Sequence, residues 1–274
     1  MAKDGKNMYR IGDYSRYMGV STDLLKHYER CGLIHAKTAE NGYRYYPFYE
    51  STRLLECMRL RNYGFSLGEI QTLLCELPYD KVQAQMDTRI EEVEKQIRFQ
   101  QMVVAEHKKV SRWMNLMRER ELCAVTEDTE TMLFLPQSRC TEFADDPRVA
   151  QLLEAWVAAM PMAKSCRLFP NIHAENPEEQ AMWGLAVSQS DAQALDLPVN
   201  DAVIRVEGGQ QLHLNIHHTL FHNQNATHYL PGVLETLRGY GVKPKKPVLQ
   251  FVIMTLECGE KSHENCCWFS ASLE

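Results

Sequence analysis

A group of polar side chains after Gly19-Val20 has the types and spacing to hydrogen-bond to the edges of DNA bases. Its members are Ser21, Thr22, Asp23, Lys26 and His27. Ser21 can cap a helix that runs from Thr22 to Cys31, and its N-terminal residues would enter a major groove first. Tyr28 lies in this helix at a position that could pack inward, and we keep it as a candidate DNA contact.

A second group combines aromatic and basic side chains in the turn Asn41-Gly42-Tyr43-Arg44-Tyr45-Tyr46. A wing of this kind can place Arg44 on a phosphate and the hydroxyl of Tyr43 or Tyr45 beside it. For any single tyrosine, packing in the core is an equally good interpretation. Basic residues near these segments complete the candidate DNA contacts: Arg10, Arg16, Arg59 and Arg61.

Short helices separated by glycine and proline must position these groups. The first helix ends near Met18, and a turn at Gly19 leads into the second, as in a helix–turn–helix. Pro47 is expected in the first turn of a third helix that continues to about Tyr63. Ser66-Leu67-Gly68-Glu69 has the pattern of a capping box and should open a fourth helix.

One long helix is predicted from Tyr79 to about Glu121, where glycine and proline are absent and charged residues are dense. Its apolar residues form a narrow seam at three- and four-residue steps: Ile90, Val93, Ile97, Val104 and Met114. Such a seam favours a two-stranded coiled coil that dimerises the chain. The alternative is an amphipathic helix that folds back on its own domain.

The last part of the chain changes to alternating apolar residues typical of strands. The runs are Met132–Leu135, Trp183–Val187, Leu212–Ile216 and Val248–Leu256, with helices expected at Val149–Ala159 and Thr227–Tyr240. We therefore predict an α+β multi-domain protein whose C-terminal domain has an antiparallel sheet. The expected domains are residues 1–77, 78–121 and 122–274.

Charge is distributed unevenly along the chain, whose net charge is −6. Residues 1–75 hold eleven Lys and Arg against eight Asp and Glu, so the excess of acidic residues lies in the remainder. A small basic head is sufficient for phosphate contacts. Without a long apolar run or a signal-peptide pattern, we expect a cytoplasmic protein with reduced thiols and no membrane partner.

The head resembles the MerR family of transcription regulators. The matching stretches are Tyr9-Arg10-Ile11-Gly12-Asp13, Gly19-Val20-Ser21, Leu25-Lys26-His27-Tyr28-Glu29-Arg30-Cys31-Gly32-Leu33-Ile34, Asn41-Gly42-Tyr43-Arg44-Tyr45 and Tyr63-Gly64-Phe65-Ser66-Leu67-Gly68-Glu69-Ile70. The family usually has Arg-Tyr or Arg-Phe where this chain has Lys26-His27, and a proline near His35-Ala36. These departures concern base preference rather than the fold.

The resemblance implies a winged helix–turn–helix head and a homodimer on a palindromic promoter whose elements are spaced too far apart for RNA polymerase. The dimer would bend and untwist this DNA, so that specificity comes partly from deformation. A signal would pass along the coiled coil as a small change in head spacing. Metal-sensing relatives carry cysteines just after this helix, where the chain has only Cys123.

The C-terminal domain resembles the gyrase-inhibitor-like effector-binding domain of drug-sensing MerR proteins, which implies a small-molecule effector such as an aromatic compound. Effector pockets are mostly apolar and aromatic with a few polar anchors. Candidate pocket residues are Trp156, Phe169, Trp183, Phe221, Tyr229, Glu235, Gln250 and Phe251. Gln250 stands where the family often has an acid, so a neutral or anionic effector is expected unless Glu207 or Glu235 substitutes.

Two clusters near the C-terminus could suggest a metal site, namely His213, His217, His218, His222 and His228, and Cys258, His263, Cys266 and Cys267. Neither forms two clean ligand pairs, so we expect no metal and no cofactor. We expect no enzyme either, because neither a Gly-x-Ser-x-Gly elbow nor a Walker loop occurs. The alternatives are a repressor without a ligand, and a weak hydrolase that uses Glu235 or His222.

Overall fold

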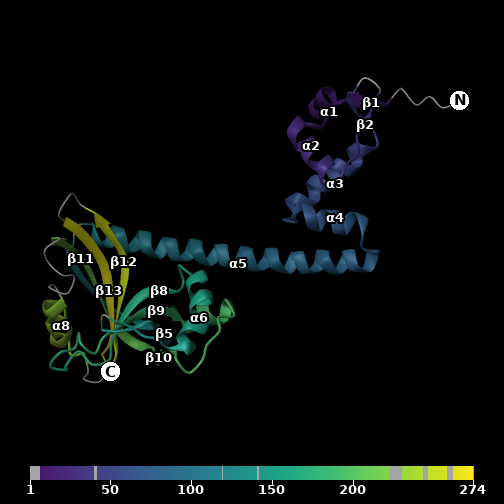
Figure 1. Ribbon diagram of the computed structural model, residues 1–274. Helices are drawn as coiled ribbons and strands as arrows, with labels where there is room; N and C mark the ends of the chain where they lie inside the picture. Colours follow the sequence, from purple (N-terminus) through teal and green to yellow (C-terminus); the bar gives the residue numbers. More distant parts are fainter. Residues whose placement is uncertain are drawn as a thin grey trace. The chain divides into compact units, whose positions relative to one another are not determined.

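The protein is described from a computed structural model, which divides by its internal contacts into two units, Met1–Ile97 and Arg98–Glu274 (Figure 1). The structure describes residues 7–39, 42–118, 120–140, 142–221, 230–242, 246–257 and 262–273. The expected domain boundaries, after residues 77 and 121, fall between elements, whereas the contacts divide the chain within a helix.

The first unit contains small helices around a three-stranded sheet. Its elements are β1 (Met8–Arg10), α1 (Ile11–Met18), α2 (Thr22–Arg30), β2 (Lys37–Thr38), β3 (Arg44–Pro47), α3 (Glu50–Asn62), α4 (Leu67–Cys75) and the start of α5 (Tyr79–Met117). The strand order is β1-β3-β2, and all pairs are antiparallel. Its core contains Tyr14, Leu25, Tyr46, Leu54 and Ile70.

Three local signals in the sequence mark helix ends as predicted, and one does not. The Ser21 hydroxyl accepts a hydrogen bond from the Leu24 N–H at 3.1 Å, as expected of an N-cap. Gly19 ends α1 at φ 67°, a conformation that favours glycine. Both hydrogen bonds of the predicted capping box between Ser66 and Glu69 are present. The expectation for Pro47 was wrong: it ends β3 opposite Met8, and the helix begins at Glu50.

Helix α5 contains 39 residues and ends at Met117, four residues before the expected end. Its predicted seam residues expose large parts of their side chains. In the first unit, Ile90 is 54% and Ile97 is 51% exposed; in the second, Val104 is 52% exposed. The seam is therefore an apolar surface that no other part of the described chain covers, although burial would stabilise residues of this type.

The second unit is built on an eight-stranded sheet with the order β10-β5-β9-β8-β12-β13-β11-β4. The strands are β4 (Leu122–Thr129), β5 (Met132–Pro136), β8 (Lys164–Phe169), β9 (Met182–Ser188), β10 (Ile204–Val206), β11 (Gly209–Phe221), β12 (Val248–Glu257) and β13 (Ser262–Ser272). Every pair is antiparallel, which confirms the predicted sheet. A separate hairpin joins β6 (Ser138–Arg139) and β7 (Glu142–Phe143).

Helices α6 (Pro147–Ala158) and α8 (Leu230–Gly239) cover two parts of the same sheet face, and α7 (Gln189–Ala194) is short. Trp156 of α6 packs with strand residues such as Leu185, whereas α8 packs with Leu214 and its neighbours. Strand register shows that these two parts share one face. A row of directly opposed residues crosses five strands: Leu214, Phe269, Gln250, Arg167 and Trp183, here named the central row.

Candidate functional site

Helix α2 presents the expected polar surface. Asp23, Lys26 and His27 are exposed, as is Arg30 one turn later, whereas Leu25 is fully buried. Lys26 Nζ lies 3.2 Å from the Asp23 carboxylate, but both side chains are largely open to solvent, so the pair is weak. This face therefore offers positive charge to a phosphate and hydrogen-bond donors to a phosphate or to the edge of a base.

Two residues of α2 differ from the sequence-based interpretation. Tyr28 is 4% exposed and lies in the core of the first unit, so it does not belong to the exposed face. Arg30 was missed, although it lies one turn after Lys26 and shares its face. The Arg30 guanidinium lies 3.5 Å from the His27 ring nitrogen Nδ1, which adds a third basic group to this surface.

The three-stranded sheet forms a wing with a basic and aromatic face. Arg10 of β1 and Lys37 of β2 both lie opposite Tyr45 of β3 in the strand register, so the three side chains share one side of the sheet. The Arg10 Nε donates to the Tyr45 hydroxyl at 3.4 Å, and its guanidinium lies 5.2 Å from the ring centre of Tyr43. Lys37 was not predicted, because its strand has only two residues.

Arg44 lies on the other side of β3 and is engaged within the protein. Its Nε is 3.4 Å from the Glu29 carboxylate, which also accepts a hydrogen bond from the Tyr46 hydroxyl at 3.2 Å. Tyr46 is fully buried and stacks on Tyr14. Burial, together with Glu29, raises the pKa of Tyr46 to about 12. Arg44 therefore links the wing to α2, and a phosphate would compete with Glu29 for it.

The remaining basic candidates differ in how strongly they are held. Arg16 pairs with Asp13 at 3.1 Å and Arg59 with Glu56 at 3.8 Å, but both arginines are more than half exposed. Arg61 donates to the Phe65 carbonyl at 3.1 Å, across the turn between α3 and α4. Arg16 and Arg59 are thus accessible to an anion, whereas Arg61 stabilises the turn. Ser21 is exposed beside this surface, and Thr22 is half-buried.

In the second unit, three of the expected pocket residues lie close together on one sheet face. Trp183 and Gln250 belong to the central row, on either side of Arg167, and the Arg167 guanidinium lies 5.1 Å from the ring centre of Phe169. The Trp183 indole is 38% exposed and donates to the Ser165 hydroxyl at 3.1 Å. Arg167 was missed by the sequence analysis. Among the described residues, no carboxylate lies within ion-pair distance of it.

The other expected pocket residues are not brought to this place. Trp156 is fully buried and donates to the Pro198 carbonyl at 3.0 Å, as a core residue does. Phe251 lies on the opposite sheet face, where it stacks on Trp268. Glu235 is exposed on α8, and Glu207 is bonded to Thr131. The Phe221 side chain and Tyr229 lie outside the described residues, as does His222.

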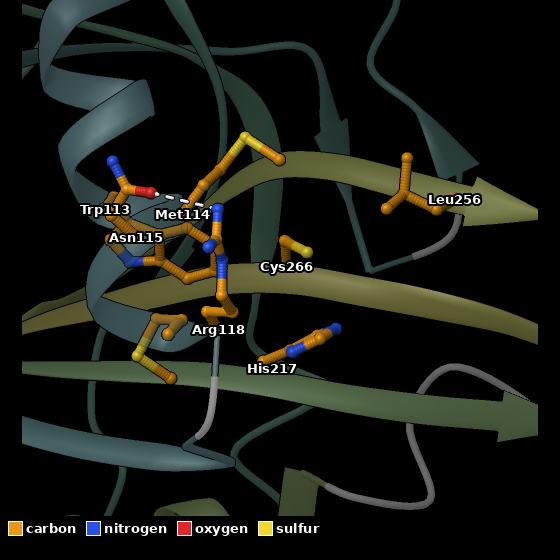
Figure 2. Close-up of a pocket in the computed structure, with 8 residues that line it drawn as sticks. Trp113, Met114, Asn115, Arg118, His217, Leu256 and Cys266 are labelled. Carbon is orange, nitrogen blue, oxygen red and sulfur yellow. Dashed lines mark hydrogen bonds between the residues drawn. The ribbon is translucent and has the colours of Figure 1, made fainter.

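A hollow of about 230 Å³ lies where α5 ends against the sheet (Figure 2). The Trp113 indole N–H donates to the Asn215 side-chain oxygen of β11 at 2.8 Å. The hollow's lining comprises Trp113, Met114, Asn115, Met117, Arg118, His217, Leu256 and Cys266. Within the part of the chain that the structure describes, this lining contains no Asp or Glu.

The histidine and cysteine clusters do not assemble a metal site in the described part of the chain, where no group of three His, Cys, Asp or Glu side chains converges. The His213 ring lies 2.5 Å from the Glu127 carboxylate. Burial lowers the pKa of His213, although Glu127 opposes this shift. His222, His228 and Cys258 lie outside the described residues, and so do the side chains of His218 and His263.

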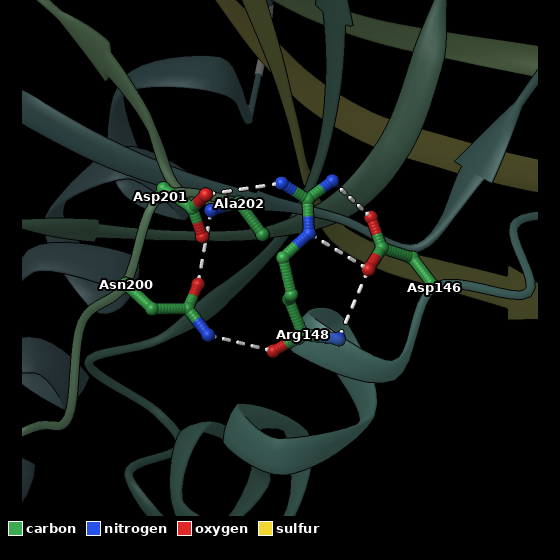
Figure 3. A network of polar contacts seen from close by, with 5 residues as sticks. All are labelled: Asp146, Arg148, Asn200, Asp201 and Ala202. Atoms are coloured by element: carbon green, nitrogen blue, oxygen red, sulfur yellow. Dashed lines mark hydrogen bonds and ion pairs between the residues drawn. The ribbon is translucent and has the colours of Figure 1, made fainter.

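Arg148 organises the start of α6 (Figure 3). Its guanidinium binds the Asp146 carboxylate at 2.7 Å and that of Asp201 at 3.1 Å. Asp146 is also the N-cap, because it accepts from the Arg148 backbone N–H at 2.9 Å. Hydrogen bonds from Arg148 lower the pKa of Asp146 to about 2. The network fastens the loop around Asn200 to this helix, because the Asn200 amide donates to the Arg148 carbonyl.

None of the helices in the described ranges combines the length and apolar character that a membrane crossing requires.

Comparison with known proteins identifies the head. The family described as MerR HTH family regulatory protein matches residues 9–77. The mercuric resistance operon regulatory protein of Bacillus cereus is 39% identical over 67 residues, which are 24% of this chain and 51% of that protein. The HTH-type transcriptional regulator HmrR of Rhizobium leguminosarum bv. viciae is 34% identical over 94 residues, which are 32% and 72% of the two chains. The multidrug-efflux transporter 2 regulator of Bacillus subtilis is 29% identical over 35% of this chain and 36% of its own.

Solved structures give looser likenesses. The EcmrR–DNA complex in EcmrR-RPo has a TM-score of 0.40 at 15% identity and covers 96% of this chain and 99% of that one. The N-terminal part of MtaN, the Bacillus subtilis multidrug transporter activator, has a TM-score of 0.33 at 25% identity over 37% and 97%. The chain spans about half the length of the mercuric regulator but 72% of HmrR, at 34% identity. It therefore belongs to the MerR family of helix–turn–helix transcription regulators.

Proposed function

We propose that the protein is a homodimeric regulator that binds a palindromic promoter and distorts it in response to a small-molecule effector. The observation that carries the DNA-binding part is the exposed basic face of α2, with Lys26, His27 and Arg30, next to a core that buries Leu25 and Tyr28. The wing adds Arg10 and Lys37 on either side of Tyr45. Arg16 and Arg59 supply further phosphate contacts.

The dimer is proposed to form through α5. Ile90, Val93 and Ile97 leave apolar surface uncovered at steps of three and four residues, as does Val104. A second copy of the same helix covers such a seam in a coiled coil, which fits the expected division into residues 1–77, 78–121 and 122–274. Two heads held as a dimer match a palindromic site and can bend it to place promoter elements in register for RNA polymerase.

The effector is proposed to bind on the central row of a gyrase-inhibitor-like domain. Trp183 supplies an exposed ring, Gln250 a buried amide, and Arg167 a positive charge. A carboxylate partner for a cationic ligand is not among the described residues of the row, so the composition favours a neutral or anionic aromatic effector. A relative that is named as a multidrug regulator is consistent with effector sensing in this chain.

Run-off transcription from the region upstream of the protein's own gene tests this proposal. Neutral, anionic and cationic aromatic compounds are added to the wild type, to Arg167→Gln and to Arg205→Gln, which changes an exposed arginine away from the row. We expect an anionic or neutral compound to change transcription, with loss of the response to anionic compounds in Arg167→Gln alone. A response to cations only, or equal responses in both variants, would refute the central row as the effector site.

A further inference from the structure

The hollow at the end of α5 lies on the sheet face opposite the central row. His217 and Cys266 face each other across β11 and β13, and alternation puts them on the other side from Leu214 and Phe269. Helix α5 reaches this side through the hydrogen bond between Trp113 and Asn215. The hollow is therefore separate from the proposed effector site, and all its lining residues belong to the second unit.

Its lining combines positive charge with apolar walls. Trp113, Met114, Met117 and Leu256 supply apolar surface, and methionine side chains adapt readily to the shape of a ligand. Arg118 supplies hydrogen-bond donors, and His217 adds a second polar side chain to the lining. Figure 2 shows Arg118 at the end of α5, with its guanidinium turned toward Asn115, and His217 and Cys266 on neighbouring strands. This lining stands out in a chain whose net charge is −6.

Arg118 is available to a ligand. Its side chain is exposed, and its contact with the Asn115 oxygen is 3.5 Å long, which is at the limit of a hydrogen bond. The indole N–H of Trp113 is already bonded to Asn215, so Trp113 offers the hollow its ring rather than a donor. A guanidinium beside apolar walls matches a carboxylate on an apolar body.

We propose that this hollow is a second small-molecule site, which binds a compact anion made of a single aromatic ring and a carboxylate. Pockets for drug-sized ligands enclose roughly 300–1,000 Å³. The hollow is smaller, at about 230 Å³, and so fits one ring. Arg118 binds the carboxylate, His217 lies beside it, and the ring packs on Trp113, Met114 and Leu256. The inference goes beyond the proposed function, because it concerns a different face of the sheet.

Fluorine NMR of 4-fluorobenzoate with the full-length protein, in the absence of DNA, measures this binding directly. We expect saturable binding at millimolar concentrations or below, and much weaker binding of the neutral isostere 4-fluorobenzamide. Arg118→Gln should weaken the binding of 4-fluorobenzoate about tenfold or more, because a charge-assisted contact is lost. His217→Gln should weaken it less.

Two control variants separate this site from other arginines. Arg112→Gln changes an exposed arginine of the same helix that does not line the hollow, and Arg167→Gln changes the central row. Arg112→Gln should bind 4-fluorobenzoate as the wild type does, and Arg167→Gln should retain the part of the binding that Arg118→Gln removes. Wild-type binding by Arg118→Gln, equal binding of the amide, or no binding at millimolar concentrations would overturn the inference. Loss of binding in Arg167→Gln alone would also overturn it while supporting the proposed effector site.

Discussion

The indole N–H of Trp113 on α5 donates a 2.8 Å hydrogen bond to the side-chain oxygen of Asn215 on β11. Asn215 is 7% exposed, and its amide in turn donates to the Cys123 carbonyl at 3.2 Å. Trp113 and Asn215 are 102 residues apart in the sequence. This contact fastens the last turns of α5 to the sheet of the second unit.

Trp113→Phe should lower the free energy of unfolding of the second unit by about 1–3 kcal/mol, because it leaves the buried Asn215 oxygen without its donor. Urea denaturation followed by circular dichroism measures the change. Trp183→Phe serves as the matched control, since its indole bonds to Ser165 at an exposed position. An equal loss in both variants would contradict a special role for the Trp113 contact.

Tyr46 should make the first unit less stable in alkali. Its pKa is raised to about 12, whereas an unfolded tyrosine titrates near 10, so the unfolded state loses its proton first. This contribution is fully present below about pH 10 and is lost as the pH rises toward 12. Tyr46→Phe should reduce the slope of stability against pH in that window, as measured by urea denaturation. Because burial also raises the pKa of Tyr14 and Tyr28, part of the slope should remain.

The Asp146–Arg148 pair should contribute to acid resistance of the second unit. The pKa of Asp146 is lowered to about 2, below that of an unfolded aspartate, so its contribution is present above about pH 4 and is lost as the pH falls through 2. Asp146→Asn should shift acid unfolding, followed by circular dichroism, to higher pH. Asp145→Asn, at the adjacent exposed position, should not. Identical acid transitions in the two variants would show that the pair is dispensable.

The α5 seam should control association. Ile97→Asp places a charge in the proposed coiled coil and should convert a dimer to a monomer in sedimentation equilibrium, because an unpaired charge in an apolar interface is strongly unfavourable. Lys95→Asp introduces an aspartate with an even larger change in net charge, at a nearby exposed position outside the seam, and should leave the dimer intact. A wild-type protein that sediments as a monomer would exclude the seam as a dimer interface.

Features that depend on neighbouring residues could be predicted from the sequence, whereas those that depend on register could not. The Ser21 cap and the Ser66–Glu69 capping box each lie within four residues. The engagement of Arg44 could not be predicted, because its partner Glu29 lies on another element. Likewise, composition could not separate Trp156, a core residue, from Trp183, an exposed one. Arg167 became a candidate only when strand pairing placed it between Gln250 and Trp183.

Footprinting of the protein on duplex DNA from the region upstream of its own gene, over a series of salt concentrations, tests whether α2 is the DNA-binding face. We expect protection of two half-sites by the wild type and by Arg205→Gln. Lys26→Ala should bind more weakly, and if Lys26 meets a phosphate, the slope of log affinity against log salt should fall by about 1. Protection that is unchanged by Lys26→Ala, His27→Ala and Arg30→Ala, or no protection by the wild type at modest salt, would contradict α2 as the DNA-binding face.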